Sequence, residues 1–145
     1  MLRRFVTAMA LCSLAACATG GGGGASSMSV KDQMAKIVQP GADVLFAVGG
    51  QVDPGNGPGA KPTDADGWKK AGDAAKNMKQ VADYMVAHPV DQGTWLTAAK
   101  QMSTLSDAAA KAANAKDGAK LSQAANDLGD NCTTCHSKYK NQHAS

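Results

Sequence analysis

The stretch LSQAANDLGDNCTTCH, from Leu121 to His136, contains the most informative pattern of this 145-residue chain. Its apolar residues recur every three or four positions, which is the spacing of one face of an α-helix. That face consists of Leu121, Ala124, Ala125, Leu128 and Cys132. Asp117 precedes the stretch and is a suitable N-cap. The sequence therefore predicts a C-terminal amphipathic helix with two cysteines and a histidine near its end.

Three further stretches show the same periodicity. The first begins at Val30 and is interrupted by Pro40, which lacks a backbone N–H and should kink the helix or split it in two. Residues 49–63 hold five glycines and three prolines, so a long loop should follow. The apolar positions of this first stretch are Val30, Met34, Ile37, Gly41, Leu45 and Val48.

The second stretch begins after Thr63 or Asp64, either of which is a plausible N-cap, and Pro89 marks its end. The third begins near Asp91. No segment alternates like a half-buried strand. Four helices joined by short turns after the first loop predict an all-α antiparallel four-helix bundle over residues 29–145. The expected buried stripes of the two middle helices are Trp68, Ala71, Ala75, Met78, Ala82 and Met85, and Trp95, Ala99, Met102, Leu105, Ala109 and Ala112.

The N-terminus has the pattern of an export signal. Residues 1–16 begin with Arg3 and Arg4 and continue with an apolar core that is too short to span a membrane. Leu14, Ala15, Ala16 and Cys17 are similar to the lipobox of bacterial lipoproteins, in which the cysteine is acylated. Residues 17–28, which are rich in glycine, would then form a flexible tether. Ordinary secretion without a lipid is the alternative.

Composition excludes several classes of function. The net charge of +3 includes the only two arginines, which lie in the expected signal, so nucleic-acid binding has no electrostatic basis. All twelve acidic residues are aspartate, which excludes catalysis by glutamate. Aromatic residues make up only 4% of the chain, and a core built from alanine has little bulk. Such a bundle could use a large buried cofactor.

Cys132, Cys135 and His136 form C-x-x-C-H, the signal for attachment of c-type haem. On a helix the two cysteines lie at i and i+3, from which both sulfurs can reach one haem edge, and His136 comes off the same face. A thioredoxin-like dithiol would need a βαβ unit, and a structural zinc site would need further ligands. A chance match is the third alternative, but the chain has only four cysteines.

An all-helical chain with C-x-x-C-H in its last helix, followed by Tyr139 and Lys140, resembles the class II c-type cytochromes, the cytochrome c′ family. The resemblance covers about residues 30–140. It implies haem c held between the first and last helices, with His136 as the proximal iron ligand. Lys140 stands where the family commonly has arginine, so a bidentate contact from this position is in doubt.

The resemblance also implies that the sixth iron ligand decides between electron transfer and gas binding. Members with methionine in the first helix are electron carriers, whereas members with an apolar residue there bind small gases. Met34 is the candidate ligand, and the alternative is that it only fills the core.

We therefore expect a non-enzymatic, His136/Met34-ligated electron carrier. Its expected location is the periplasm, where Cys17 would anchor it by lipid to a membrane, with the outer membrane favoured. Its expected partners are periplasmic or membrane redox proteins, and a homodimer is possible. A five-coordinate protein that binds nitric oxide or carbon monoxide, and a haem-free structural lipoprotein, are the two alternative functions.

Overall fold

A computed structural model describes residues 27–59 and 63–140 of the chain. In these residues the structure consists of helices and connecting turns, as the periodicity predicts. The elements in chain order are α1 (Val30–Gln33), the π-helical turn η1 (Met34–Val38), α2 (Gln39–Gln51), the 3₁₀ segment η2 (Pro54–Gly59), α3 (Ala65–Ala87), α4 (Thr94–Ala115) and α5 (Gly118–Tyr139).

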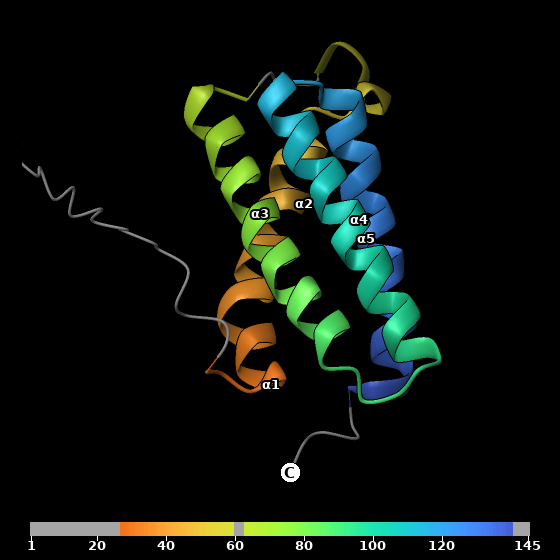
Figure 1. Cartoon of the computed structure of the whole chain (residues 1–145). Helices are drawn as coiled ribbons and strands as arrows, with labels where there is room; N and C mark the ends of the chain where they lie inside the picture. Colours follow the sequence, from red (N-terminus) through yellow and green to blue (C-terminus); the bar gives the residue numbers. More distant parts are fainter. Residues whose placement is uncertain (1–26, 60–62, 141–145) are drawn as a thin grey trace, which may run out of the picture.

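Four helical segments pack against one another (Figure 1). The continuous segment α1–η1–α2 is the first, and α3, α4 and α5 are the others. Helix α3 packs on α2 and α4, and α5 packs on α4 and α2, so the helices close a ring around one core. The start of α1 and the end of α5 lie at the same end of the molecule (Figure 1).

Two of the predicted N-caps are confirmed. The Asp64 carboxylate accepts a hydrogen bond from the Gly67 backbone N–H at 2.7 Å, and the Asp117 carboxylate accepts one from the Lys120 N–H at 3.1 Å. Each satisfies a donor that has no partner inside its helix. Helix α4 ends at Lys116, which adopts the left-handed conformation with φ 55°. The tight turn from α4 into α5 follows from this ending.

The core is built mainly from alanine, with a few larger side chains between the helices. Alanine at the contacts lets helices approach closely, and it leaves the longer side chains to fill the space that remains. Among the described residues, the largest fully buried side chains are Leu45, Met78, Met85, Leu121, Leu128, Gln33, Val81 and Ser106. The predicted stripes of α3, α4 and α5 face this core, except that Trp68, Leu105 and Cys132 are only half-buried.

The first helix differs from its prediction at its end. The interruption expected at Pro40 takes the form of the π-helical turn η1, which ends at Val38, and α2 follows from Gln39. The helix continues to Gln51, so the expected loop begins later than Gly49. Gly49 is buried and lies against α5, and that packing outweighs its low helix propensity. Helix α4 in turn begins at Thr94, three residues after Asp91.

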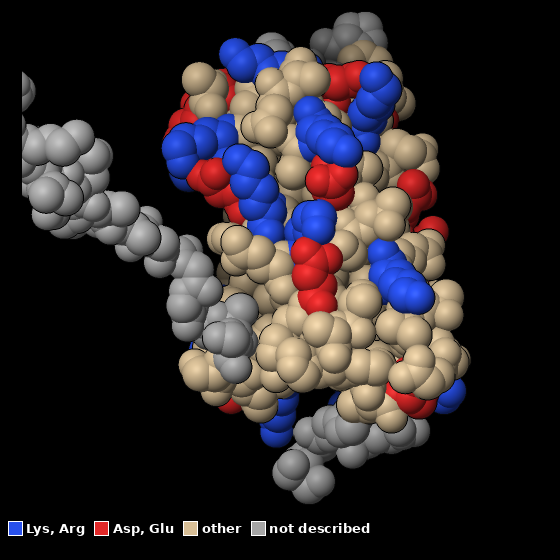
Figure 2. Space-filling view, in the orientation of Figure 1, with Lys and Arg blue, Asp and Glu red and all other residues tan. Residues whose placement is uncertain are grey.

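Lysine and aspartate alternate over the outer faces of the helices (Figure 2). Six Lys–Asp pairs lie within 4 Å among the described residues, all within one helix or its cap. Exposed pairs of this kind contribute little to stability but keep the surface soluble. No helix in the described part of the chain is long and apolar enough to cross a membrane.

Candidate functional site

Helix α5 presents the three residues of the C-x-x-C-H motif along its last turns. The Cys132 and Cys135 thiols are half-buried, whereas His136 is exposed. Both cysteines are free thiols, with no disulfide between them. The helix continues unbroken past the motif to Tyr139, so the three side chains keep helical spacing.

Met34 lies across from this motif. A small cavity of about 30 Å³ separates η1 from α5, and Met34, Cys132, Cys135 and His136 all line it. These four predicted site residues come from opposite ends of the described chain, and the fold brings them together. The remaining lining residues are Val38, Met85, Ala98, Met102 and Asn131.

Burial controls the reactivity of the two thiols. It raises the pKa of the Cys132 thiol, and it raises that of Cys135 together with the nearby Cys132 and Asp91. Because the thiolate is the reactive form, both cysteines stay protonated and unreactive near neutral pH in this closed arrangement.

The end of α5 is held by contacts from the α3–α4 connection. The buried Tyr139 hydroxyl donates a hydrogen bond to Asp91 and accepts one from the Trp95 backbone N–H at 3.2 Å. The Tyr139 and Trp95 rings meet edge to face, with centroids 5.3 Å apart. The Tyr139 hydroxyl, with help from the Gly93 and Trp95 N–H groups, holds the pKa of Asp91 below its usual range. These contacts fix the helical turn that carries His136.

Asn131 is a site residue that sequence analysis missed. It is 5% exposed, and its Nδ2 donates to the Ala98 carbonyl at 3.1 Å, but its Oδ1 has no partner among the described residues. A buried acceptor without a partner is costly, so this atom marks a polar spot in a mainly apolar cavity wall. Its position four residues before Cys135 was the only available signal, because that spacing places both residues on one helix face.

The donor set fits haem c. Two thiols and one imidazole on a single helix, with a thioether opposite, match the ligands of a c-type haem. Among the described residues, no three His, Cys or acidic side chains gather to hold a metal ion by themselves. The cavity of about 30 Å³ is far smaller than the roughly 300–1,000 Å³ of ordinary ligand sites. A large planar group would therefore require η1 to move away from α5.

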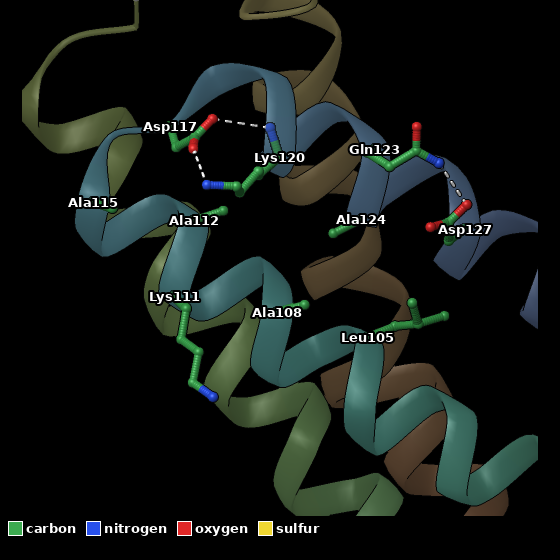
Figure 3. Close-up of a pocket in the computed structure, with 10 residues that line it drawn as sticks. All are labelled: Leu105, Ala108, Lys111, Ala112, Ala115, Asp117, Lys120, Gln123, Ala124 and Asp127. Carbon is green, nitrogen blue, oxygen red and sulfur yellow. Dashed lines mark hydrogen bonds and ion pairs between the residues drawn. The ribbon is translucent and has the colours of Figure 1, made fainter.

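Another cavity lies between α4 and the first half of α5 (Figure 3). It is open and measures about 470 Å³. Alanines form much of its lining, and its acidic groups are already engaged: Asp117 pairs with Lys120, and Asp127 accepts from Gln123. None of the predicted site residues lines it. Polar groups do not converge on a common point in it, as they would in a catalytic site.

The expected lipid site at Cys17, the signal over residues 1–16 and most of the tether lie outside the described residues. Comparisons of the chain with protein-family models, with curated proteins and with solved structures found no match. The features of this chain that point to a function are the C-x-x-C-H motif and the cavity between η1 and α5.

Proposed function

We propose that this chain is a single-haem c-type cytochrome that transfers electrons and does not act as an enzyme. One observation carries the proposal: Met34 lines the same small cavity as Cys132, Cys135 and His136. A chance C-x-x-C-H has no reason to face a methionine about a hundred residues away in the chain.

The residues divide the work as follows. Cys132 and Cys135 would hold haem c by thioether links, and His136 and Met34 would hold the iron from its two sides. When bound, haem supplies an iron atom that cycles between two oxidation states. The methionine-rich wall, with Met85 and Met102, keeps the surroundings apolar, and a low dielectric disfavours the more highly charged oxidation state.

The exposed position of His136 supports electron transfer at the surface of the protein. His136 is exposed and both cysteines are half-buried, so this end of α5 is open to solvent. A cofactor edge at this place would be accessible to a second redox protein. The proposed partners are periplasmic or membrane redox proteins, with Cys17 as the lipid anchor to a bacterial membrane.

Two measurements test the proposal. The full chain is produced with a cytochrome c maturation system, and the pyridine haemochrome is recorded for wild type and for Cys132→Ala with Cys135→Ala. The expected result is covalent haem in wild type and none in the double variant. Absence of covalent haem in wild type would overturn the proposal and favour a haem-free structural lipoprotein.

The ferric absorption spectrum identifies the sixth ligand. We expect a methionine-to-iron charge-transfer band in wild type that disappears in Met34→Ala. Met102→Leu is the matched control, because Met102 lines the same cavity from α4, and this variant should keep the band. A high-spin wild-type spectrum with ready binding of carbon monoxide or nitric oxide would replace the electron carrier with the gas-binding alternative.

A further inference from the structure

The π-helical turn η1 stands directly before Pro40, and the proline explains it. In an α-helix the N–H of residue 40 would bond to the Lys36 carbonyl, but proline has no N–H and its ring clashes with that carbonyl. The chain instead makes a wider turn, in which the Gln39 N–H donates to the Met34 carbonyl five residues earlier. Helix α2 then proceeds normally from Gln39. Turns of this kind occur often at functional sites.

Two glycines define which side of α2 faces which neighbour. A methyl group added at Gly41 would lie 3.1 Å from the Met78 Cγ, so this side of α2 meets α3. One added at Gly49 would lie 3.0 Å from the Ala125 Cβ, so that side meets α5. Leu45 lies between these two directions and is fully buried. The positions of Gly41 and Gly49 therefore show which side of α2 faces α3 and which side faces α5.

The wide turn changes the direction in which Met34 points. Each residue of an α-helix turns by about 100°, so an unbroken helix would place Met34 roughly 20° from Gly41, on the side that meets α3. A π-turn holds about one extra residue, which rotates everything before it by roughly a quarter of a turn relative to α2. The rotation moves Met34 toward the direction of Gly49, which is the side of α5. This agrees with the place of Met34 in the cavity beside Cys132 and His136.

Gln33 shows the cost of this rotation. In an unbroken helix it would lie roughly 120° from Leu45 and face solvent. In the structure it is fully buried, its Nε2 donates to the Met28 carbonyl, and its Oε1 has no partner within residues 27–59 and 63–140. A buried polar atom without a partner is unfavourable, so the arrangement of η1 is not the one that local burial alone would select.

We propose that Pro40 is a positioning residue: by forcing the π-turn, it rotates Met34 toward the helix that carries His136. The inference rests on the proposed function, because the rotation matters for haem binding only if Met34 is an iron ligand. The same rotation buries Gln33.

The test uses Pro40→Ala, with Pro89→Ala as the control, since Pro89 lies in the connection between α3 and α4. In the haem-loaded chain, Pro40→Ala should lose the methionine-to-iron charge-transfer band while covalent haem is retained, and Pro89→Ala should keep the band. Retention of the band in Pro40→Ala would overturn the inference.

A second measurement needs no haem. In the haem-free full chain labelled at its methionine methyl groups, the Met34 methyl should show nuclear Overhauser contacts both to α5 and to Met85 of α3 in wild type. In Pro40→Ala the contacts to α5 should be lost and those to α3 kept. Unchanged contacts would overturn the inference. If the α5 contacts are lost in Pro40→Ala as expected but haem-loaded wild type lacks the charge-transfer band, Pro40 positions Met34 as proposed, and the proposal that Met34 binds the iron is wrong.

Gln33→Leu keeps the inference testable if Pro40→Ala does not fold. Leucine removes the buried amide, whose Oε1 has no partner among the described residues, but leaves the π-turn. The variant should therefore unfold at a higher urea concentration than wild type and keep the band. A lower midpoint, or loss of the band, would show that Gln33 is not a cost of the rotation and would overturn the inference.

Discussion

Gly49 and Gly50 are adjacent in α2, yet the structure predicts opposite effects of replacing each with alanine. A methyl group at Gly49 would lie 3.0 Å from the Ala125 Cβ and 3.6 Å from the Ser122 Cα of α5. At Gly50 a methyl group would meet nothing within 4 Å. The two substitutions are chemically identical, so their difference measures how closely α2 approaches α5.

The magnitude follows from two opposing effects. Alanine is favoured over glycine in a helix by about 0.5–1 kcal/mol, and this gain applies at both positions, reduced at Gly50 because α2 ends one residue later. A contact of 3.0 Å is well inside the roughly 3.5–4.0 Å optimum between carbon atoms. Relieving such overpacking costs about 1–3 kcal/mol. We therefore expect Gly49→Ala to lose about 1 kcal/mol and Gly50→Ala to gain up to about 0.5 kcal/mol.

Urea denaturation followed by far-ultraviolet circular dichroism gives both free energies of unfolding. The refuting result is equal stability of the two variants, because it would mean that α2 and α5 do not pack at the distance described. The result matters for the site as well. The turn that carries Met34 leads into α2, and α5 carries His136, so this contact holds together the two helical segments that bear the candidate ligands.

Two further predictions concern polar groups. Ser106 is fully buried and its hydroxyl has no partner in the described part of the chain, so Ser106→Ala should raise the free energy of unfolding by about 1 kcal/mol in urea denaturation. A loss of stability would mean that the hydroxyl is hydrogen-bonded in solution. The pKa of Asp91 is lowered chiefly by the Tyr139 hydroxyl, so its contribution to stability is present above the unfolded-state pKa and is lost as pH falls through the lower folded-state value. Tyr139→Phe should therefore lose less stability than wild type between pH 7 and about pH 3 in urea titrations, where the Asp carboxylates titrate; parallel pH profiles would contradict the role of this hydrogen bond.

Much of the fold could be predicted because its determinants are local. Periodic apolar residues marked all four helical stretches, and the Asp64 and Asp117 caps each depend on a side chain and an N–H three residues away. The C-x-x-C-H motif is local too, since helical spacing alone places Cys132, Cys135 and His136 close together.

The errors arose where distant segments decide the outcome. The helix continues through Gly49 because α5 packs against it, and a local pattern of glycine predicts only a loop. Asn131 could not be singled out, because its significance depends on an unpaired oxygen beside a cavity formed by three other helical segments.

The sequence by itself determined the helices, their caps and the chemical identity of the candidate ligands, since each depends on residues within a few positions of one another. Only the tertiary structure decided that Met34 shares a cavity with His136 and that Gln33 is buried while Met34 is half-buried. The π-turn before Pro40 rotates Met34 and Gln33 relative to α2. Which neighbours these side chains then meet depends on α3 and α5, which lie far along the chain.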